Sequence, residues 1–497
     1  QTCALPISIW DSILYEKVRF EENITMLLNC SCLDAQMEGN NIKSIKGWQL
    51  TTETWHIVEA KLFADCSGDS ILAPLTGAEF RIGREASSEY NESIEPEVAD
   101  KKTMGLSCLL QARETDRPQK FIPPSWAYKY LTDDELPQRG HLIKNTNFWW
   151  IEIGGENDSI HDTEELRDEL LKIVFGVWDH IKNHGDHGAE NWILDWVGFL
   201  PGKRESRRYI GDYVLTQNDV QAEGRFEDII AYGGWPMDDH NPAGFRYPGP
   251  PNINHYAPSP YGIPYRCLYS KNIGNLFFAG RNISTTHAAL SSTRVMATCA
   301  LLGQAVGTAA SIAVKNNLTP RGVYNEKIEE LKQTLMDDDC YLPFNKRKIP
   351  ELSANAQLSA SDGDPSCLRN GFDRPVEGNS NMWIGKKNSY VEYSFDGLKN
   401  VSKVRLVFDS DLNRKGQNMP CYYSLDQEPY KVPEVMVKDF RIDIKDANGN
   451  WITCKKVVNN YQRLVKLDLS VEATAVRFIP EETWGSEEVH VFSFDVE

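Results

Sequence analysis

The apolar residues of this chain fall into successive patterns that predict different structures. Between residues 20 and 63, apolar and polar positions alternate around a turn at residues 38–41, which predicts a small antiparallel sheet. Residues 276–279 are a short apolar run bounded by Gly280 and predict a buried strand. Residues 351–497 alternate again over short stretches separated by turns. They predict an all-β sandwich of about 145 residues, an ordinary domain size.

Periodicity also predicts an amphipathic helix and a polar helix. In residues 163–183, apolar side chains recur at the spacing that places them on one helix face, and Asp162 with Glu165 is expected to cap the first turn. Residues 325–336 predict the polar helix. The rest of residues 80–271 is irregular and rich in aromatic side chains.

Residues 295–314 predict a third helix, which contains no charged residue. Ser291, Ser292 or Thr293 is expected to cap it, so that its first-turn N–H groups carry the positive end of the helix dipole. Twenty uncharged residues also have the length of a membrane span. The polar side chains and the many alanines favour a helix buried against a parallel sheet, and we expect no membrane span.

Composition restricts the partners of the protein. The 497 residues carry a formal net charge of −18 and have a pI near 5.1. We therefore expect no nucleic-acid partner and no anionic membrane surface, because phosphate binding requires basic patches. The eleven cysteines include no C-x-x-C pair, which favours free thiols over a disulfide framework.

Three blocks of sequence resemble a bacterial family of FAD-dependent oxidoreductases, distant relatives of the fumarate-reductase flavoproteins. Residues 280–307 contain G-R-x-x-S-x-T-H-x-A, S-x-R-V-M and G-Q-A-x-G in order, like the family's carboxy-terminal flavin signature. Residues 62–70 (LFADCSGDS) resemble its strand ending in D-x-T-G-D-G, with Ser67 and Ser70 as conservative departures. Residues 202–208 (GKRESRR) form the third block.

The resemblance implies a fold class and a domain division. It implies an α/β, Rossmann-like FAD-binding domain made of residues 1–79 and 272–345, with an inserted α+β substrate domain at residues 80–271. The sandwich of residues 351–497 resembles galactose-binding-like or discoidin modules, which either bind sugar or only pack against their enzyme.

The amino-terminal sequence departs from the family. A dinucleotide-binding fold normally opens with G-x-G-x-x-G, and this chain has no such motif. Residues 1–7 (QTCALPI) instead read like a translated sequencing adapter, so we expect that the amino terminus of the flavin domain, with any signal peptide, is missing. The alternative is a genuine first strand. Localisation, in the cytoplasm or the periplasm, is therefore left open.

The cofactor implied by the resemblance is FAD. Its expected contacts are eight residues from the first two blocks: Gly280, Arg281, Arg294, Val295, Met296, Asp65, Gly68 and Asp69. For Asp69, the alternative role is to cap a turn or a helix.

The expected catalytic residues are His287, Arg204 and Arg207. His287 could face the flavin and accept a substrate proton, because a free imidazole is mostly neutral at pH 7. It could equally be a hydrogen-bonded core residue. The arginines could clamp a carboxylate or a carbonyl of the substrate, or form salt bridges with Glu205 and Asp212.

His180, His184 and His187 are spaced as H-x-x-x-H-x-x-H, with Asp186 between the last two. This spacing could present ligands to zinc. It also fits cations that complement the dipole at the end of a helix. The resemblance requires no metal, and we expect none.

The leading functional hypothesis is an FAD-dependent oxidoreductase. Hydride would pass between flavin and a small polar substrate, which the appended sandwich suggests is a sugar or sugar-derived compound. Oxidation of a secondary alcohol and reduction of an activated double bond both remain open, and the electron acceptor is unknown. The competing hypothesis is a non-catalytic glycan-binding or interaction protein on a degenerate flavoprotein fold.

Overall fold

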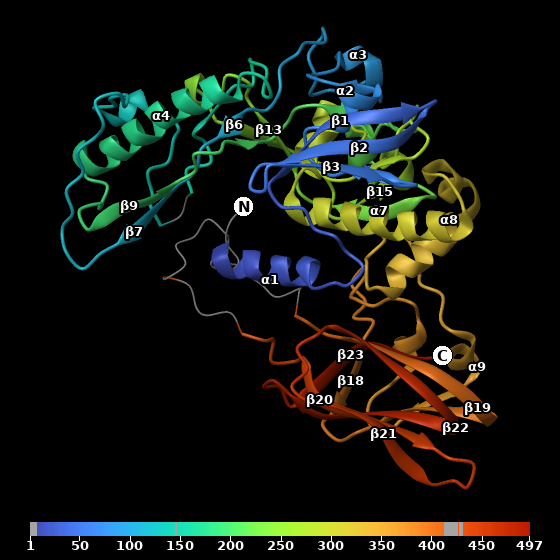
Figure 1. Ribbon diagram of the computed structural model, residues 1–497. Helices are drawn as coiled ribbons and strands as arrows, with labels where there is room; N and C mark the ends of the chain where they lie inside the picture. The colour runs from blue at the N-terminus through green and yellow to red at the C-terminus, as the bar shows by residue number, and fades with distance from the viewer. Residues whose placement is uncertain (1–6, 145–146, 412–425, 427–430) are drawn as a thin grey trace. The chain divides into compact units, whose positions relative to one another are not determined.

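The computed structural model describes residues 7–144, 147–411, 426 and 431–497 (Figure 1). Residues 1–6, which hold most of the expected adapter sequence, lie outside this part of the chain. The chain forms two compact units. Of the described residues, those up to Lys332 together with residue 426 form the N-terminal unit, and the remainder form the C-terminal unit.

Two short parallel strands join distant parts of the N-terminal unit. They are β4 (Phe63–Asp65) and β16 (Leu276–Phe278). Every residue of β16 is buried, which confirms the strand predicted at residues 276–279. Because the strands run in the same direction, the chain segments that follow Asp65 and Phe278 emerge at the same edge.

A three-stranded antiparallel sheet confirms the alternating pattern between residues 20 and 63. Its strands, in the order β1-β2-β3, are β1 (Cys30–Glu38), β2 (Asn41–Gln49) and β3 (Thr54–Glu59). The helix α1 (Ile7–Arg19), which precedes this sheet, was not predicted.

The predicted amphipathic helix is α4 (Thr163–Asn183), with the expected bounds. Leu170, Val174 and Trp178 are fully buried in one apolar cluster that includes residues of neighbouring strands. The predicted capping pair is wrong. Asp162 precedes the helix but makes no capping hydrogen bond to it, because its Oδ2 accepts from the backbone N–H of Asp158 (3.1 Å) instead.

The third predicted helix is α7 (Met296–Asn316), close to the expected bounds, and a separate helix that was not predicted, α6 (His287–Thr293), precedes it. The expected cap at residues 291–293 is wrong, because these residues lie inside α6. Thr286 caps α6 by accepting from the N–H of Ala289 (3.3 Å). Val295 has an extended backbone with ψ 144°, which separates the two helices.

Among the described residues, α7 is the one helix long and apolar enough to cross a membrane. Length and composition alone identify no span, because buried helices of globular domains share both properties. Leu302, Ala305 and Ala309 on one face of α7 are fully buried within the N-terminal unit.

The remaining elements of this unit are short. They are α2 (Leu72–Thr76), β5 (Phe80–Arg81), α3 (Ser87–Tyr90), β6 (Leu106–Ser107), β7 (Leu110–Glu114), η1 (Asp133–Glu135), β8 (Glu152–Ile153), β9 (Trp192–Val197), β10 (Gly202–Lys203), β11 (Arg208–Tyr209), α5 (Gln217–Gln221), β12 (Ile229–Gly233), β13 (Met237–His240), η2 (Gly244–Arg246), β14 (Asn252–His255), β15 (Tyr261–Pro264) and η3 (Tyr265–Cys267). The predicted polar helix is α8 (Pro320–Asp337), which continues into the C-terminal unit.

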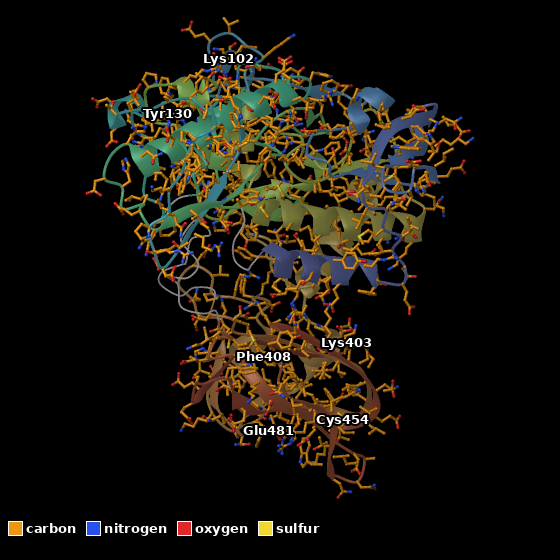
Figure 2. All side chains as sticks on the ribbon, turned by 60° about the vertical axis from the view of Figure 1, so that its left-hand side comes forward. Lys102, Tyr130, Lys403, Phe408, Cys454 and Glu481 are labelled. Atoms are coloured by element: carbon orange, nitrogen blue, oxygen red, sulfur yellow. The ribbon has the colours of Figure 1, made fainter. Side chains whose placement is uncertain are left out.

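The C-terminal unit confirms the predicted all-β sandwich. Its elements are α9 (Glu351–Asn355), β17 (Gln357–Ala360), η4 (Ser366–Arg369), β18 (Trp383–Lys386), β19 (Val391–Phe408), β20 (Val437–Lys445), β21 (Trp451–Val457), β22 (Leu464–Thr483) and β23 (Glu488–Val496). The antiparallel strands follow the order β18-β23-β19-β22-β20-β21, and β17 also pairs with β19. Trp383 and Phe408, the latter labelled in Figure 2, are fully buried in its apolar core.

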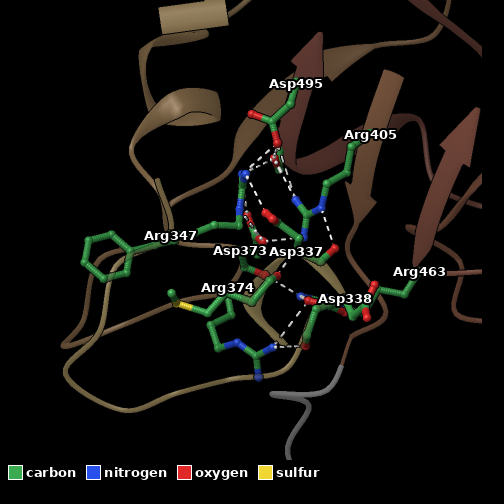
Figure 3. Close-up of polar contacts among 12 residues, drawn as sticks. Asp337, Asp338, Arg347, Asp373, Arg374, Arg405, Arg463 and Asp495 are labelled. Atoms are coloured by element: carbon green, nitrogen blue, oxygen red, sulfur yellow. Dashed lines mark hydrogen bonds and ion pairs between the residues drawn. The ribbon is translucent and has the colours of Figure 1, made fainter. Parts of the chain in front are cut away.

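A buried group of charges also holds the C-terminal unit together (Figure 3). Arg405 contacts Asp373 (2.8 Å), and Arg347 contacts both Asp373 (3.2 Å) and Asp495 (2.7 Å). Burial alone would raise the pKa of the Asp373 carboxyl, but the charges of Arg405 and Arg347 outweigh burial and lower it. The ionised state of Asp373 therefore stabilises the fold.

We predict that Asp373→Ala strongly destabilises the C-terminal unit, because it leaves two buried guanidinium groups short of a partner. Breaking a buried pair costs about 3–5 kcal/mol. Hydrogen–deuterium exchange of peptides from β19 and β23 measures the loss as faster exchange. The matched control is Asp396→Ala, which removes an exposed partner of Lys399 in the same unit and should leave the exchange of these peptides unchanged. Equal exchange in both variants would contradict the prediction.

Candidate functional site

The three sequence blocks meet where β4 and β16 end. Asp69, four residues after β4, accepts from Arg281 Nη2 (2.6 Å), three residues after β16. Lys203 and Ser206 of the third block reach the same carboxylate, at 2.9 and 2.7 Å. Burial would raise the pKa of Asp69, but Arg281 and Lys203 outweigh burial and lower it. Asp69 is therefore an ionised partner of two cations.

Two glycines make this close approach possible. Gly68 has φ +76°, and a Cβ there would lie 2.9 Å from Arg281 Nε. Any other residue would push the guanidinium away from Asp69. Gly280 has φ +107°, and an added Cβ would meet only Asn282 Oδ1, at 3.4 Å. Gly280 is therefore required by the bend of the backbone rather than by crowding.

The carboxylate of Asp65 accepts hydrogen bonds from other groups of the protein. Its Oδ1 accepts from the N–H (2.9 Å) and the hydroxyl of Ser67, and its Oδ2 accepts from the N–H of Leu72 (2.9 Å) and the hydroxyl of Tyr209 (2.6 Å). Four hydrogen bonds saturate a carboxylate. Asp65 thus fixes the turn between β4 and α2, and its contact with a cofactor stays a prediction.

Arg294, Val295 and Met296 form the junction between α6 and α7. Arg294 donates to the backbone oxygen (3.0 Å) and the carboxylate (3.2 Å) of Asp238, but its buried Nε has no hydrogen-bond partner among the described residues. No side chain caps α7, and Met296 is 49% exposed. The N-terminus of α7 therefore presents uncapped N–H groups beside a buried cation.

The positive charges of Arg281 and Arg294 both influence Cys299 in the first turn of α7. Burial raises the pKa of the Cys299 thiol to about 11, and the charges of both arginines oppose this rise. Burial and the charge of Arg204 lower the pKa of Arg294 itself. This region thus combines several positive groups with a helix dipole, and an electron-rich group placed there would be stabilised.

His287 is buried between two carboxylates. Its Nδ1 lies 2.8 Å from Glu205 Oε2 and its Nε2 lies 3.3 Å from Asp239 Oδ1, while its backbone N–H donates to Glu85. Burial would lower the pKa of His287, but Glu205 and Asp239 outweigh burial and raise it well above the usual value. The ring is therefore held as a cation that donates from both nitrogens. These are the contacts of a hydrogen-bonded core residue, and the role as a proton acceptor stays a prediction.

The arginines of the third block differ in their partners. Arg204 lies 3.2 Å from Glu152 and donates to Ser107 Oγ (2.7 Å), so it forms a salt bridge, although not with the carboxylates expected from sequence. Arg207 donates to the backbone oxygen of Asp69 (3.3 Å). Within the described parts of the chain, Arg207 has no carboxylate within 4.0 Å. Of the expected catalytic arginines, Arg207 is thus the one without a carboxylate partner among the described residues, and its binding of a substrate stays a prediction.

Sequence reasoning missed a buried acidic cluster beside His287. Glu85, Glu92 and Glu95 bring carboxylate oxygens within 4.8 Å of one another. Both oxygens of Glu95 are buried without a hydrogen-bond partner among the described residues, and burial raises its pKa to about 7. Glu85 directly follows the Gly83-Arg84 pair, but no spacing signal in the sequence connects it with Glu92 and Glu95.

A separate cavity lies elsewhere in the N-terminal unit. It has a volume of about 680 Å³ and is lined by residues that include Phe80, Arg81, Tyr90 and Lys271. None of the eight expected cofactor contacts lines it.

Comparison with known proteins identifies the N-terminal unit. A protein-family model described as "FAD dependent oxidoreductase" matches residues 6–335, which is more than half of the chain. No curated protein matches the chain. The residues at the α7 junction fit FAD, because the uncapped helix terminus and the unpartnered Arg294 Nε suit the electron-rich edge of a flavin.

Solved structures similar to the C-terminal region include three carbohydrate-binding modules. The family 32 module of Streptococcus pneumoniae EndoD is 15% identical, with 29% of this chain and 97% of the module covered and a TM-score of 0.22. The family 32 module of C. perfringens NanJ in complex with galactose is 10% identical, with 29% of this chain and 95% of the module covered and a TM-score of 0.22. A fucose-binding module of Streptococcus pneumoniae is 16% identical, with 31% of this chain and 97% of the module covered and a TM-score of 0.23. Values this low carry no conclusion about a ligand of this chain.

We predict that Glu95→Gln stabilises the N-terminal unit at about pH 8 and has little effect at about pH 4. The pKa of Glu95 is about 7 in the fold, against a usual value of 4.5 for a glutamate carboxyl in water. The unfolded chain therefore releases this proton first, and stability falls as pH rises through that interval. Ionisation of Glu95 lowers the free energy of unfolding by up to about 3 kcal/mol, because one pKa unit corresponds to about 1.4 kcal/mol.

Thermal unfolding midpoints of the wild type and the variant at both pH values measure this effect. The control is Glu97→Gln, which removes the charge of an exposed carboxyl two residues from Glu95 and should leave the midpoint unchanged at both pH values. A Glu95→Gln variant that is less stable than the wild type at about pH 8 would contradict the account.

Proposed function

Because the chain belongs to the FAD-dependent oxidoreductase family, we propose that it transfers hydride between flavin and a small polar substrate. The observation that carries the proposal is the meeting of the three sequence blocks at Asp69 and Arg281. Residues far apart in sequence converge there on one positively charged edge beside the N-terminus of α7. A reduced flavin develops negative charge along one ring edge, and such an edge stabilises that charge.

Six of the eight predicted cofactor contacts have a stated part in the proposal. Arg294, Val295 and Met296 present the α7 N-terminus and a buried guanidinium to the flavin ring. Arg281 is oriented by Asp69, and Gly280 allows the backbone to lie close to the flavin. When bound, FAD supplies the hydride chemistry, while these residues hold and orient it and stabilise its charge.

The substrate would lie near Arg207 and His287, under residues 80–271. Arg207 would bind a carboxylate or a carbonyl of the substrate through its guanidinium N–H groups. A cationic His287 can supply a proton but cannot accept one. This charge state favours reduction of an activated double bond over oxidation of an alcohol.

The remaining parts of the proposal rest on the resemblance seen in the sequence. The flavin domain would comprise residues 1–79 and 272–345, and the module of residues 351–497 would bind sugar. On this basis we propose a sugar-derived substrate.

We predict that Arg294→Gln weakens FAD binding about tenfold or more, because a charged hydrogen bond contributes about 1.5–3 kcal/mol. Titration of FAD into the purified chain, followed by flavin fluorescence, measures the dissociation constant. The control Arg113→Gln removes an exposed arginine that pairs only at the surface with Asp195, and should leave the constant unchanged. The same titration on a chain extended upstream tests the expected loss of the amino terminus.

The direction of the reaction is read from flavin absorbance under anaerobic conditions. Reoxidation of the reduced protein by an unsaturated, sugar-derived acid, without bleaching of the oxidised protein by sugar alcohols, would support reduction. Bleaching by an alcohol would contradict the proposed direction but not the family. Failure of both the chain and its extended form to bind FAD would overturn the proposed function.

A further inference from the structure

Three histidines and one aspartate converge beside the C-terminal end of α4. His180 lies in the last turn of α4, His187 follows in the next loop, and Asp133 and His141 come from the segment that begins with η1. Their four ligand atoms all lie within 4.8 Å of one another. The side chains of His180, His141 and His187 are 0%, 11% and 11% exposed, so the cluster is enclosed on the histidine side.

The spacing of the ligand atoms matches a tetrahedral metal site. Asp133 Oδ1 lies 3.0 Å from His180 Nε2, 3.6 Å from His187 Nε2 and 3.9 Å from His141 Nδ1. The Nε2 atoms of His180 and His187 are 3.1 Å apart. Zinc–nitrogen bonds of about 2.0–2.1 Å place two ligands of a tetrahedron about 3.3–3.4 Å apart. The four measured distances fall on both sides of that value, so small rotations of the side chains would complete the geometry.

The surroundings hold two of these rings in a ligating orientation. His180 Nδ1 donates to the backbone oxygen of Tyr130 (2.9 Å), a residue labelled in Figure 2. This bond fixes the tautomer whose Nε2 carries a free electron pair, which is the usual support of a metal-bound histidine. Gly185 has φ +114°, and a Cβ there would lie 2.8 Å from His187 Nε2. The glycine thus leaves the space that the His187 ring needs.

We propose that Asp133, His141, His180 and His187 bind one divalent metal ion of the zinc class. Three imidazole nitrogens and one carboxylate oxygen are the ligands that zinc accepts, and four protein ligands leave no open position. The site is therefore structural. It fixes the segment from η1 to His141 and the loop after α4 to the end of that helix.

This proposal replaces the expectation from sequence that no metal is bound. The H-x-x-x-H-x-x-H spacing supplies only two ligands, because His184 instead lies 3.5 Å from Asp179. The other two ligands, Asp133 and His141, precede α4 by more than twenty residues and carry no spacing signal. The cluster includes none of the expected flavin contacts, so it stands whether or not the proposed redox function holds.

Metal content of the full chain, without a histidine tag, tests the proposal. The protein is stripped with a chelator, loaded with zinc sulfate or cobalt chloride, passed through a desalting column and analysed by elemental mass spectrometry. We expect about one ion per chain, and cobalt should give the intense visible absorption of four-coordinate Co²⁺. Less than about one-tenth of an ion per chain, or a weak six-coordinate cobalt spectrum, would overturn the proposal.

Variants separate the site from adventitious binding. His141→Ala and His187→Ala should each lower retained metal at least tenfold, whereas the matched control His184→Ala should retain it. His187→Cys keeps a ligand and should add a sulfur-to-cobalt charge-transfer band, which a merely structural histidine would not produce. Circular dichroism confirms folding of each variant. Equal metal loss in His184→Ala and His187→Ala, or the absence of the new band in folded, cobalt-loaded His187→Cys, would overturn the assignment.

Discussion

The parallel pairing of β4 with β16 is the constraint on which the N-terminal unit depends. It joins segments more than two hundred residues apart and directs both chains to the same edge. Asp69 and Arg281 then meet at 2.6 Å, and the third block contributes Lys203 to the same carboxylate. Without this pairing, the two motifs that define the flavin resemblance would have no reason to lie together. The pairing therefore links the fold to the proposed redox function.

Both units bury charged side chains in their interiors. Arg208 in the N-terminal unit is fully buried between Glu85 and Glu205, and Arg405 in the C-terminal unit is 2% exposed beside Asp373. Taking such groups out of water is costly unless each has an opposite charge and satisfied hydrogen bonds. Arg208 has the opposite charges, but its buried Nε has no hydrogen-bond partner among the described residues. Glu95 lacks hydrogen-bond partners in the same part of the chain, and a buried carboxyl of this kind next to a cationic histidine is typical of the perturbed pairs found at functional sites.

Local pattern was enough to predict several of the elements, but not the contacts between them. The apolar run at residues 276–279 and the periodicity of residues 163–183 encode their own structure, because burial of one strand or one helix face suffices. Helix α6 was missed because Thr286, which caps it, lies outside the expected cap at residues 291–293. The charge state of His287 could not be predicted either, because Glu205 and Asp239 reach it from distant segments.

The most direct test of the central claim is a double-mutant cycle on Asp69 and Arg281, read as the FAD dissociation constant. Asp69→Asn, Arg281→Gln and the double variant are compared with the wild type. If Asp69 acts by orienting Arg281 toward the flavin, the two effects are coupled by about 0.5–3 kcal/mol, and the double variant binds FAD little worse than Arg281→Gln alone. Strictly additive effects, or FAD binding that neither substitution changes, would contradict the account.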